Sequence, residues 1–370
     1  MSKGRRASQR SLSVLVTFAV LAGVGLWAEA QKRRASALDP DEQKIDAHGR
    51  EAEVPESIPV RGLSDVFWRV FHEITTDRVM LISAGVTFYL LLAIFPALAA
   101  LVSLYGLVAD PSTMADHLNA LATLLPPGSF EIVADQVASL AASRDRTLGL
   151  TFFAGLIIAL WSTRNGVLAI FDAMNVAYDE DEKRGLFKRN MIGLAFTSGG
   201  ILGLTVLIGL VAVLPATLTY LWLDGSDERL LLILRWPLLL VLAFVAVTCI
   251  YRYGPSRAPA RLRWLTWGAG LTVVAWIVMS AGFSFYLSNF ADYNAAYGAF
   301  GALMGLLIWI WLSVGILIVG AEVNAELEHQ TARDTTTGPP RPMGARGAFV
   351  ADTVGATADE SKSKEASCTP

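Results

Sequence analysis

Long apolar runs dominate the pattern of hydrophobic and polar positions along this 370-residue chain. Six runs follow one another: residues 79–109, 147–171, 191–223, 230–251, 264–291 and 293–321. Four of them carry no charge, and the other two carry one arginine each, Arg164 or Arg235. A bilayer core about 30 Å thick needs roughly 20 helical residues to cross it. The runs therefore predict an all-α, polytopic transmembrane helix bundle with six core spans.

Two further stretches have the period of an amphipathic helix. In residues 62–76, one helical face gathers six apolar side chains: Leu63, Val66, Phe67, Val70, Phe71 and Ile74. This spacing, with arginines alongside, predicts a helix that lies on the inner membrane surface. Residues 111–143 predict a pair of outer amphipathic helices. That pair either covers the external mouth of the bundle or only packs on neighbouring helices.

Lysine and arginine in the loops indicate the orientation of the bundle. The segment "NVAYDEDEKRGLFKRN" (175–190) holds four basic residues, and "YRYGPSRAPARLRW" (251–264) holds four more. The intervening loop 224–229 holds one, and the loop 288–297 holds none. Short basic loops stay on the cytoplasmic side. We therefore expect the N-terminal flank of the core and the C-terminus to be cytoplasmic.

The two ends of the chain lie outside the predicted membrane domain, residues 60–328. Residues 1–30 form a basic-then-apolar segment that is typical of a signal anchor. It is an uncleaved helix, a cleaved signal peptide, or the product of a misassigned start codon; the basic residues that follow it favour the uncleaved helix. Residues 31–59 are predicted to be a disordered linker and residues 329–370 a disordered cytoplasmic tail, because both are polar and lack periodicity.

Composition supports membrane insertion and argues against several functions. The chain is 54% hydrophobic and only 17% charged, with a mean hydropathy of +0.47, so its average surface does not face water. A net charge of −3 argues against a nucleic-acid partner. Its two cysteines and four dispersed histidines build neither a disulfide framework nor a metal site. We found no phosphate-binding loop, nucleophile elbow or HExxH motif, and we predict no catalytic residue, cofactor or metal.

Polar residues at membrane depth are the remaining site candidates, because they are costly there. The second core span carries four within one helical face: Arg164, Asn165, Asp172 and Asn175. At the inner end of the last span, Glu322 and Asn324 are the expected partners, with an Arg164–Glu322 contact at similar depth. This group is either a substrate or ion pathway or a structural polar seam in which Arg164 snorkels.

The ordered set of motifs resembles a known family. The matching stretches are "SAGVTFYLLLAIFPALAAL", "LWSTRNGVLAIFDAMNVAYDEDEKRGLFKRN", "YRYGPSRAPARLRWLTWGAG" and "FSFYLSNFADYNAAYGAFGALMGLLIWIWLSVGILIVGAEVNAELE". Together they are similar to the YihY / virulence factor BrkB family over about residues 61–328. The resemblance implies a six-helix protein of the bacterial inner membrane with a poorly defined activity. Members have carried ribonuclease BN and serum-resistance labels, and no established catalytic residues come with the match.

Three functions are compatible with these features. The first is a transporter or permease-like protein for a small or lipid-associated solute, in which Arg164 and Asp172 bind or gate and Glu322 neutralises charge or carries a proton. The second is a non-transporting scaffold for envelope integrity or virulence. A ribonuclease ranks last. The expected partners are the lipid bilayer and an unidentified solute, and a homo-oligomer is compatible with the sequence.

Overall fold

The computed structural model describes residues 47–105, 150–213, 225–289 and 301–358. Its six long helices coincide with the six apolar runs: α4 (Val79–Tyr105), α7 (Leu150–Ala177), α8 (Leu186–Ile208), α10 (Gly225–Tyr253), α11 (Leu262–Asn289) and α13 (Gly301–His329). Shorter elements are η1 (Pro55–Ser57), α3 (Val60–Thr76), the π-helical turn η3 (Gly209–Val213) and α14 (Phe349–Asp352). Within these ranges the only β-pairing is an isolated bridge, Ala260–Thr336. The all-α prediction is confirmed.

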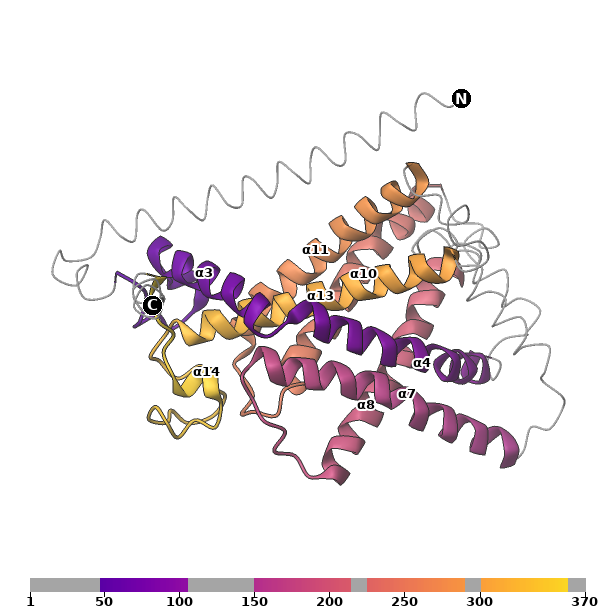
Figure 1. The fold of residues 1–370 in the computed structure, drawn as a ribbon. Helices are drawn as coiled ribbons and strands as arrows, with labels where there is room; N and C mark the ends of the chain where they lie inside the picture. The colour runs from indigo at the N-terminus through magenta and orange to yellow at the C-terminus, as the bar shows by residue number, and fades with distance from the viewer. Residues whose placement is uncertain (1–46, 106–149, 214–224, 290–300, 359–370) are drawn as a thin grey trace.

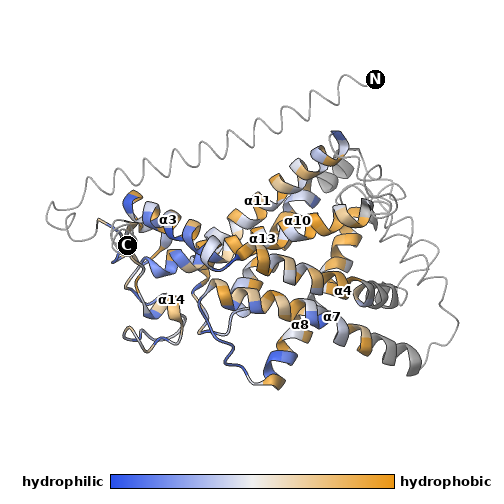
Figure 2. Cartoon of the chain, in the orientation of Figure 1, coloured by the Kyte–Doolittle hydropathy of each residue, from blue (hydrophilic) through white to orange (hydrophobic). Residues whose placement is uncertain are grey.

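The long helices have the surface expected of lipid-facing elements. Large apolar side chains are exposed along five of them, for example Leu92 on α4, Ile157 on α7, Leu202 on α8, Val241 on α10 and Val278 on α11. Figure 2 shows hydrophobic residues along the long helices and hydrophilic ones gathered near α3 and α14. Exposed apolar surface on this scale marks contact with lipid or protein.

Four helices of the described residues are long and apolar enough to cross a membrane. They are Leu186–Val211, Leu234–Tyr253, Leu262–Asn289 and Leu303–His329. A fifth span is counted if α3 and the first part of α4, which meet at a bend of 59°, form one broken span. The multi-pass architecture is thus established, while the count of six spans stays a prediction. The predicted N-terminal helix (1–30) and outer helices (111–143) lie outside the described residues.

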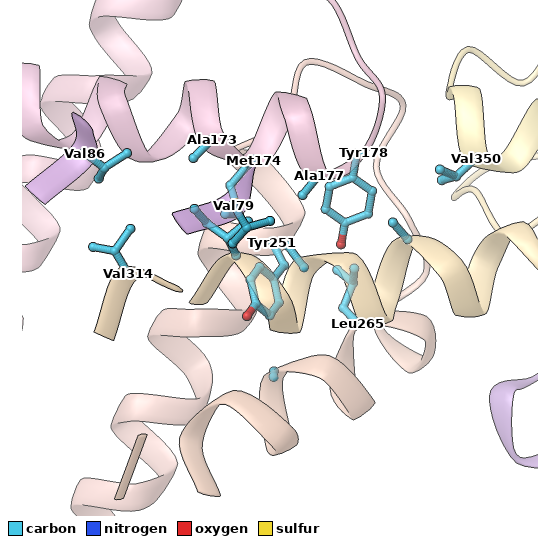
Figure 3. Close-up of a cluster of buried hydrophobic side chains, with 14 of the residues drawn as sticks. Val79, Val86, Ala173, Met174, Ala177, Tyr178, Tyr251, Leu265, Val314 and Val350 are labelled. Carbon is cyan, nitrogen blue, oxygen red and sulfur yellow. The ribbon is translucent and has the colours of Figure 1, made fainter. Parts of the chain in front are cut away.

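A buried apolar cluster joins five of the long helices, all except α8, near one end of the bundle. Val79 of α4, Met174 of α7, Tyr251 of α10 and Leu265 of α11 meet there (Figure 3), together with residues of α13 such as Ile318. These side chains are almost fully buried. The same end carries α3 and α14, whereas α4 and α7 extend toward the opposite end (Figure 1).

Helix α3 ends abruptly because the backbone reverses its curvature at Arg78. The Asp77 N–H donates to the carbonyl of Glu73 at 2.8 Å, which closes the last turn. Arg78 then adopts a φ of 52°, in the left-handed region that non-glycine residues rarely occupy. Its carbonyl accepts the first bonds of α4, from Leu81 and Ile82. This elbow turns an amphipathic helix into an apolar one.

Two terminal segments, residues 47–59 and 330–358, pack against each other and form what we call the cap. The Ala332 N–H donates to the carbonyl of Arg50 at 2.8 Å. In return, the Arg50 guanidinium donates to the carbonyl of Gly355 at 2.7 Å. The cap lies at the end of the bundle that carries α3 and α14 (Figure 1).

We expected residues 31–59 and 329–370 to be disordered. For residues 47–59 and 330–358, which form the cap, this expectation is wrong, because both segments are ordered in the structure. Its stability comes from side chains that bind backbone groups rather than from periodic apolar faces. Arg346 is 5% exposed and donates to the carbonyls of Ala332 (2.8 Å) and Ala351 (2.6 Å). Bonds from single side chains to backbone carbonyls leave no periodic pattern in the sequence, which is why polarity alone indicated disorder.

Helices α10, α11 and α13 cross closely at two glycines. The Tyr251 hydroxyl donates to the carbonyl of Leu317 at 2.8 Å and lies 2.6 Å from the Thr272 hydroxyl. A Cβ atom on Gly320 would overlap Thr272, and one on Gly268 would overlap the Gly320 carbonyl. Glycine therefore permits the backbones to approach at this crossing.

We predict that Gly268→Ala destabilises the protein by about 1–3 kcal/mol, because the added methyl group overpacks the α11–α13 crossing. Gly270→Ala is the matched control on the same helix, since a Cβ there meets nothing within 4 Å. Thermal unfolding in detergent compares the two. Equal melting temperatures would contradict the close crossing.

Candidate functional site

The polar face of α7 is directed toward α8 rather than toward α13. The Arg164 guanidinium donates to the side-chain oxygen of Asn190 and lies over the Trp161 ring, 3.7 Å from its centre. Asp172 accepts two bonds from Arg189, at 2.6 and 2.8 Å. Both charged groups of α7 thus find their partners at the start of α8, and the expected Arg164–Glu322 contact is replaced by the Arg164–Asn190 bond.

The two asparagines on the polar face of α7 differ in solvent exposure. Asn165 is exposed. Asn175 is buried, and its side-chain oxygen accepts the Ser256 N–H at 2.7 Å. Its amide nitrogen lies 3.4 Å from Glu182. Asn175 therefore joins α7 to the loop between α10 and α11.

Asn324 clamps α13 to α11. The side chain is fully buried. Its oxygen accepts the Gly268 N–H at 2.8 Å, and its nitrogen donates to the carbonyl of Leu265 at 3.2 Å. Both functional groups of the amide are thus satisfied by backbone, as a buried amide requires.

Three glutamates near the end of α13 are buried, and two of them have arginine partners. Glu326 binds Arg69 of α3, whose guanidinium also donates to the carbonyl of Glu326 at 3.1 Å. Glu328 accepts from Arg257 at 2.6 Å, and the side chains of this pair are 0% and 2% exposed. Arginine neutralises a buried carboxylate and supplies several donors at once.

The third glutamate, Glu322, has no arginine partner among the residues that the structure describes. It is 2% exposed, and its Oε1 atom has no hydrogen-bond partner among the described residues. Asp77, at the α3–α4 elbow, is the acid whose charge acts on Glu322 most strongly. Glu73 and Glu326 are the other acids that act on it. We call Glu73, Asp77, Asp179 and Glu322 the acid cluster.

Asp179 brings the end of α7 into the acid cluster. It follows α7 with a φ of 51°, the same left-handed conformation that Arg78 adopts at the elbow. Asp179 is exposed, and partial loss of solvation at the end of α7, together with the negative charge of Glu326, raises the pKa of its carboxyl. Among the described residues, no group of three or more His, Cys, Asp or Glu is arranged to hold a metal ion.

Hydrogen bonds connect the loop between α7 and α8, the loop between α10 and α11, and α14, all at this end of the bundle. The Lys183 N–H donates to the Ser256 hydroxyl at 2.9 Å, and Arg184 donates to the carbonyls of Tyr253 and Gly254 at 3.0 and 2.8 Å. The Phe349 N–H of α14 donates to Glu180 at 2.7 Å. The two basic loops, α3 and the C-terminal segment thus share one end of the bundle, which agrees with the charge pattern.

A family model described as "Virulence factor BrkB" matches residues 70–344. The chain belongs to this family. The resemblance stated from the motifs is therefore confirmed, and the protein is a membrane protein of the BrkB family.

Relatives of this BrkB-family protein include the putative ribonuclease-like protein YfkH of Bacillus subtilis, 32% identical over 66% of this chain and 88% of the relative. The UPF0761 membrane protein Nmul_A0452 of Nitrosospira multiformis is 25% identical over 76% of this chain and 65% of its own length. The UPF0761 membrane protein VP0125 of Vibrio parahaemolyticus is 26% identical over 71% and 82%. No solved structure matches the chain.

Sequence reasoning identified Glu322 but missed the other members of the acid cluster. Asp77 follows directly on the predicted helix 62–76, and Asp179 lies in the predicted loop after the second span, so both look like ordinary capping or loop residues. Their shared position at the inner ends of the first two spans was the available signal. It was concealed for Asp179 because that residue belongs to an acidic run that also contains Glu180 and Glu182.

We predict that Glu328→Gln destabilises the BrkB-family protein by about 3–5 kcal/mol, because it leaves Arg257 buried without its counter-charge. Glu51→Gln is the control: it removes the salt bridge to Arg333, whose partners are 60% and 55% exposed, and is expected to change stability by less than about 1 kcal/mol. Chemical or thermal unfolding in detergent measures both. Similar losses in the two variants would contradict a buried Arg257–Glu328 pair.

Glu182 generates a second prediction, for acid pH. Burial raises the pKa of its carboxyl, but hydrogen bonds from Arg184 outweigh burial and hold the pKa at about 2, below the ordinary 4.5. A depressed pKa stabilises the fold above about pH 4.5, and this contribution is lost as the pH falls toward 2. The difference in melting temperature between the wild type and Glu182→Gln should therefore shrink over that window. A constant difference would contradict the ionised Glu182–Arg184 contact.

Proposed function

We propose that this BrkB-family protein is permease-like and moves a small or lipid-associated solute across the bacterial inner membrane, with the cap in the cytoplasm. The observation that carries the proposal is the acid cluster. An unpaired carboxyl at the edge of an apolar bundle is costly, and such groups at membrane depth commonly belong to substrate or ion pathways. Glu322 is 2% exposed and has an oxygen without a partner in the described residues.

The six predicted site residues take different roles in this proposal. Glu322 handles the charge of the solute or of a coupling ion, beside Asp77. Arg164, Asn165 and Asp172 form the α7 side of a polar track along α8. Asn175 and Asn324 hold the helices in position, because both bind backbone groups of neighbouring elements.

A non-transporting scaffold is the second candidate, and one observation favours it. Arg164, Asp172, Asn175 and Asn324 all have partners within the protein, as residues that only lock helices together would. RNA cleavage ranks third. It is suggested by the printed name of the Bacillus subtilis relative, and we carry no residue role over from that name.

Transport by purified protein in proteoliposomes separates the first two candidates. We use ethidium, a lipophilic cation that suits the acid cluster, and a fluorescent phospholipid as the lipid-associated probe. We expect the wild type to move at least one probe, and Arg164→Ala to lose most of this movement while its melting temperature stays within a few degrees. Arg333→Ala, which removes only an exposed ion pair, is the control and should transport normally.

The outcomes decide between the candidates. Movement of neither probe by correctly inserted wild-type protein would contradict the permease proposal and favour the scaffold. If Arg164→Ala unfolds, Arg164→Lys keeps the charge, and a folded but inactive lysine variant would still support a pathway role. An active Arg164→Lys would reduce Arg164 to a structural residue. Cleavage of added RNA in the presence of Mg²⁺ would instead favour the third candidate.

A further inference from the structure

A stripe of exposed side chains runs along one side of α7. Another side of this helix packs on α4, where a Cβ atom on Gly166 would lie 3.1 Å from the Leu90 side chain. In a predicted span an exposed side meets lipid, so aliphatic members of the stripe are expected and polar members are costly. The members, which fall within an arc of roughly 100°, are Ile157, Ile158, Trp161, Asn165, Asp172 and Val176.

Arg164 borders this stripe, and all its described contacts are with neutral groups. Its Nη1 atom donates to the side-chain oxygen of Asn190, and its Nε atom donates to the carbonyl of Trp161 at 3.2 Å. The guanidinium carbon lies 3.7 Å from the centre of the Trp161 ring. Within the described part of the chain, Arg164 therefore has no carboxylate partner, and its Nη2 atom makes no hydrogen bond.

Nearby arginines show the contrast. Arg257 pairs with Glu328 at 2.6 Å, and Arg189 donates twice to Asp172, at 2.6 and 2.8 Å. Asp172 is thus already held by another cation, and it lies about 12 Å from Arg164 along the helix axis. A cation in a predicted span is costly without a counter-charge. An anionic ligand at Arg164 would remove this cost.

The donors that remain on Arg164 suit a phosphate. The bond to Asn190 uses one N–H of Nη1, which leaves the other N–H of Nη1 and both of Nη2 for a ligand. This planar fork matches the oxygens of a phosphate group and can donate to two of them at once. Large apolar side chains lie exposed on both helices that supply these contacts: Ile157 and Ile158 on α7, and Leu186 and Phe187 at the start of α8. A ligand that fits both features carries a phosphate and hydrocarbon chains.

We propose that Arg164 binds the phosphate group of a phospholipid whose acyl chains lie on the exposed apolar part of the α7 stripe. Two observations argue for this occupant: a guanidinium without a carboxylate partner in the described residues, and an apolar surface beside it that is continuous with the lipid-facing side of the helix. Asn190 and the Trp161 ring hold the guanidinium in place. As the substrate of a permease, the phospholipid rests on the proposed function; as a bound ligand, it does not.

Native mass spectrometry of the full-length protein, released from detergent, tests the binding of phosphatidylglycerol against diacylglycerol with the same acyl chains. We expect the wild type to retain the phospholipid at least about tenfold more than the diacylglycerol, which lacks the phosphate. Equal retention of the two lipids would overturn phosphate recognition. Glycerol phosphate, which lacks acyl chains, is the competitor. Its displacement of phosphatidylglycerol at equal concentration would overturn the lipid in favour of a free phosphate compound.

Substitutions test whether Arg164 carries the binding. Arg164→Ala should lower the retention of phosphatidylglycerol about tenfold, with a melting temperature within a few degrees of the wild type. Lys188→Ala is the matched control, because it removes an exposed cation at the start of α8 that has no ion pair within the described residues. It should change retention by less than about twofold. Equal losses in the two variants, or no loss in Arg164→Ala, would overturn the proposal.

Arg164→Lys is the second variant if Arg164→Ala does not fold. Lysine keeps the charge but cannot offer two parallel N–H bonds, so retention should still fall, and unchanged retention would overturn the proposal.

The remaining outcomes separate the site from the permease function and from a second copy of the chain. If phosphatidylglycerol is retained while the fluorescent phospholipid does not move, the permease function fails and the binding site stands. Movement by a wild type that retains no phosphatidylglycerol is the reverse. Disulfide crosslinking between two copies through Ile157→Cys, in a background with Cys249→Ser and Cys368→Ser, would overturn the lipid site, because a second copy would then cover the stripe.

Discussion

Burying acidic side chains at one end of α13 is the constraint on which the rest of this structure depends. Glu322, Glu326 and Glu328 are all at most 5% exposed, and a buried carboxylate needs a counter-charge, several donors or a proton. Arg69 from α3 binds Glu326, and Arg257 from the loop after α10 binds Glu328. Glu322 has no arginine partner among the described residues, and its Oε1 atom accepts no hydrogen bond there.

These ion pairs explain why distant parts of the chain gather at one end. Arg69 cannot reach Glu326 unless α3 packs on α13, and Arg257 cannot reach Glu328 unless the loop folds back beneath α7. The cap then covers the pairs. Thr335 donates to Glu328 at 2.8 Å, and Ala358 donates to Asp65 at 3.0 Å. The need to neutralise the buried glutamates of α13 thus explains why the cap packs there, although it carries little apolar surface of its own.

The helices could be predicted from the sequence and the cap could not, and the reason is physical. The helices follow from local composition, because a run of about 20 apolar residues has few alternatives to a buried or membrane-embedded helix. All six long helices lie where the runs are. The cap depends on single contacts between residues far apart in the chain, such as Arg50 with Gly355, and these have no local signature.

The candidate site shows the same division. Arg164, Asp172 and Glu322 were recognisable because charge is rare in apolar runs, but their partners were not. Asn190 and Arg189, the partners of Arg164 and Asp172, follow a loop whose course cannot be predicted from the sequence. Asp77, the acid near Glu322, looks like an ordinary residue between two helices. Asn175 and Asn324 look like pathway residues in a sequence and act as clamps in the structure. Residue type identified the polar groups that are costly to bury. Only the geometry showed that Glu322 has no arginine partner within the described part of the chain.

Hydrogen–deuterium exchange on the full chain in lipid nanodiscs tests most directly whether the cap removes the α13 acids from water. Residues 47–59 and 330–358 should exchange at least about 100-fold more slowly than unstructured peptide, as hydrogen-bonded backbone in a packed unit does. Substituting Arg69 with alanine should accelerate exchange in both segments together. Exchange of these segments at the rate of free peptide would contradict the account, because acids that are open to water need no buried arginine partner.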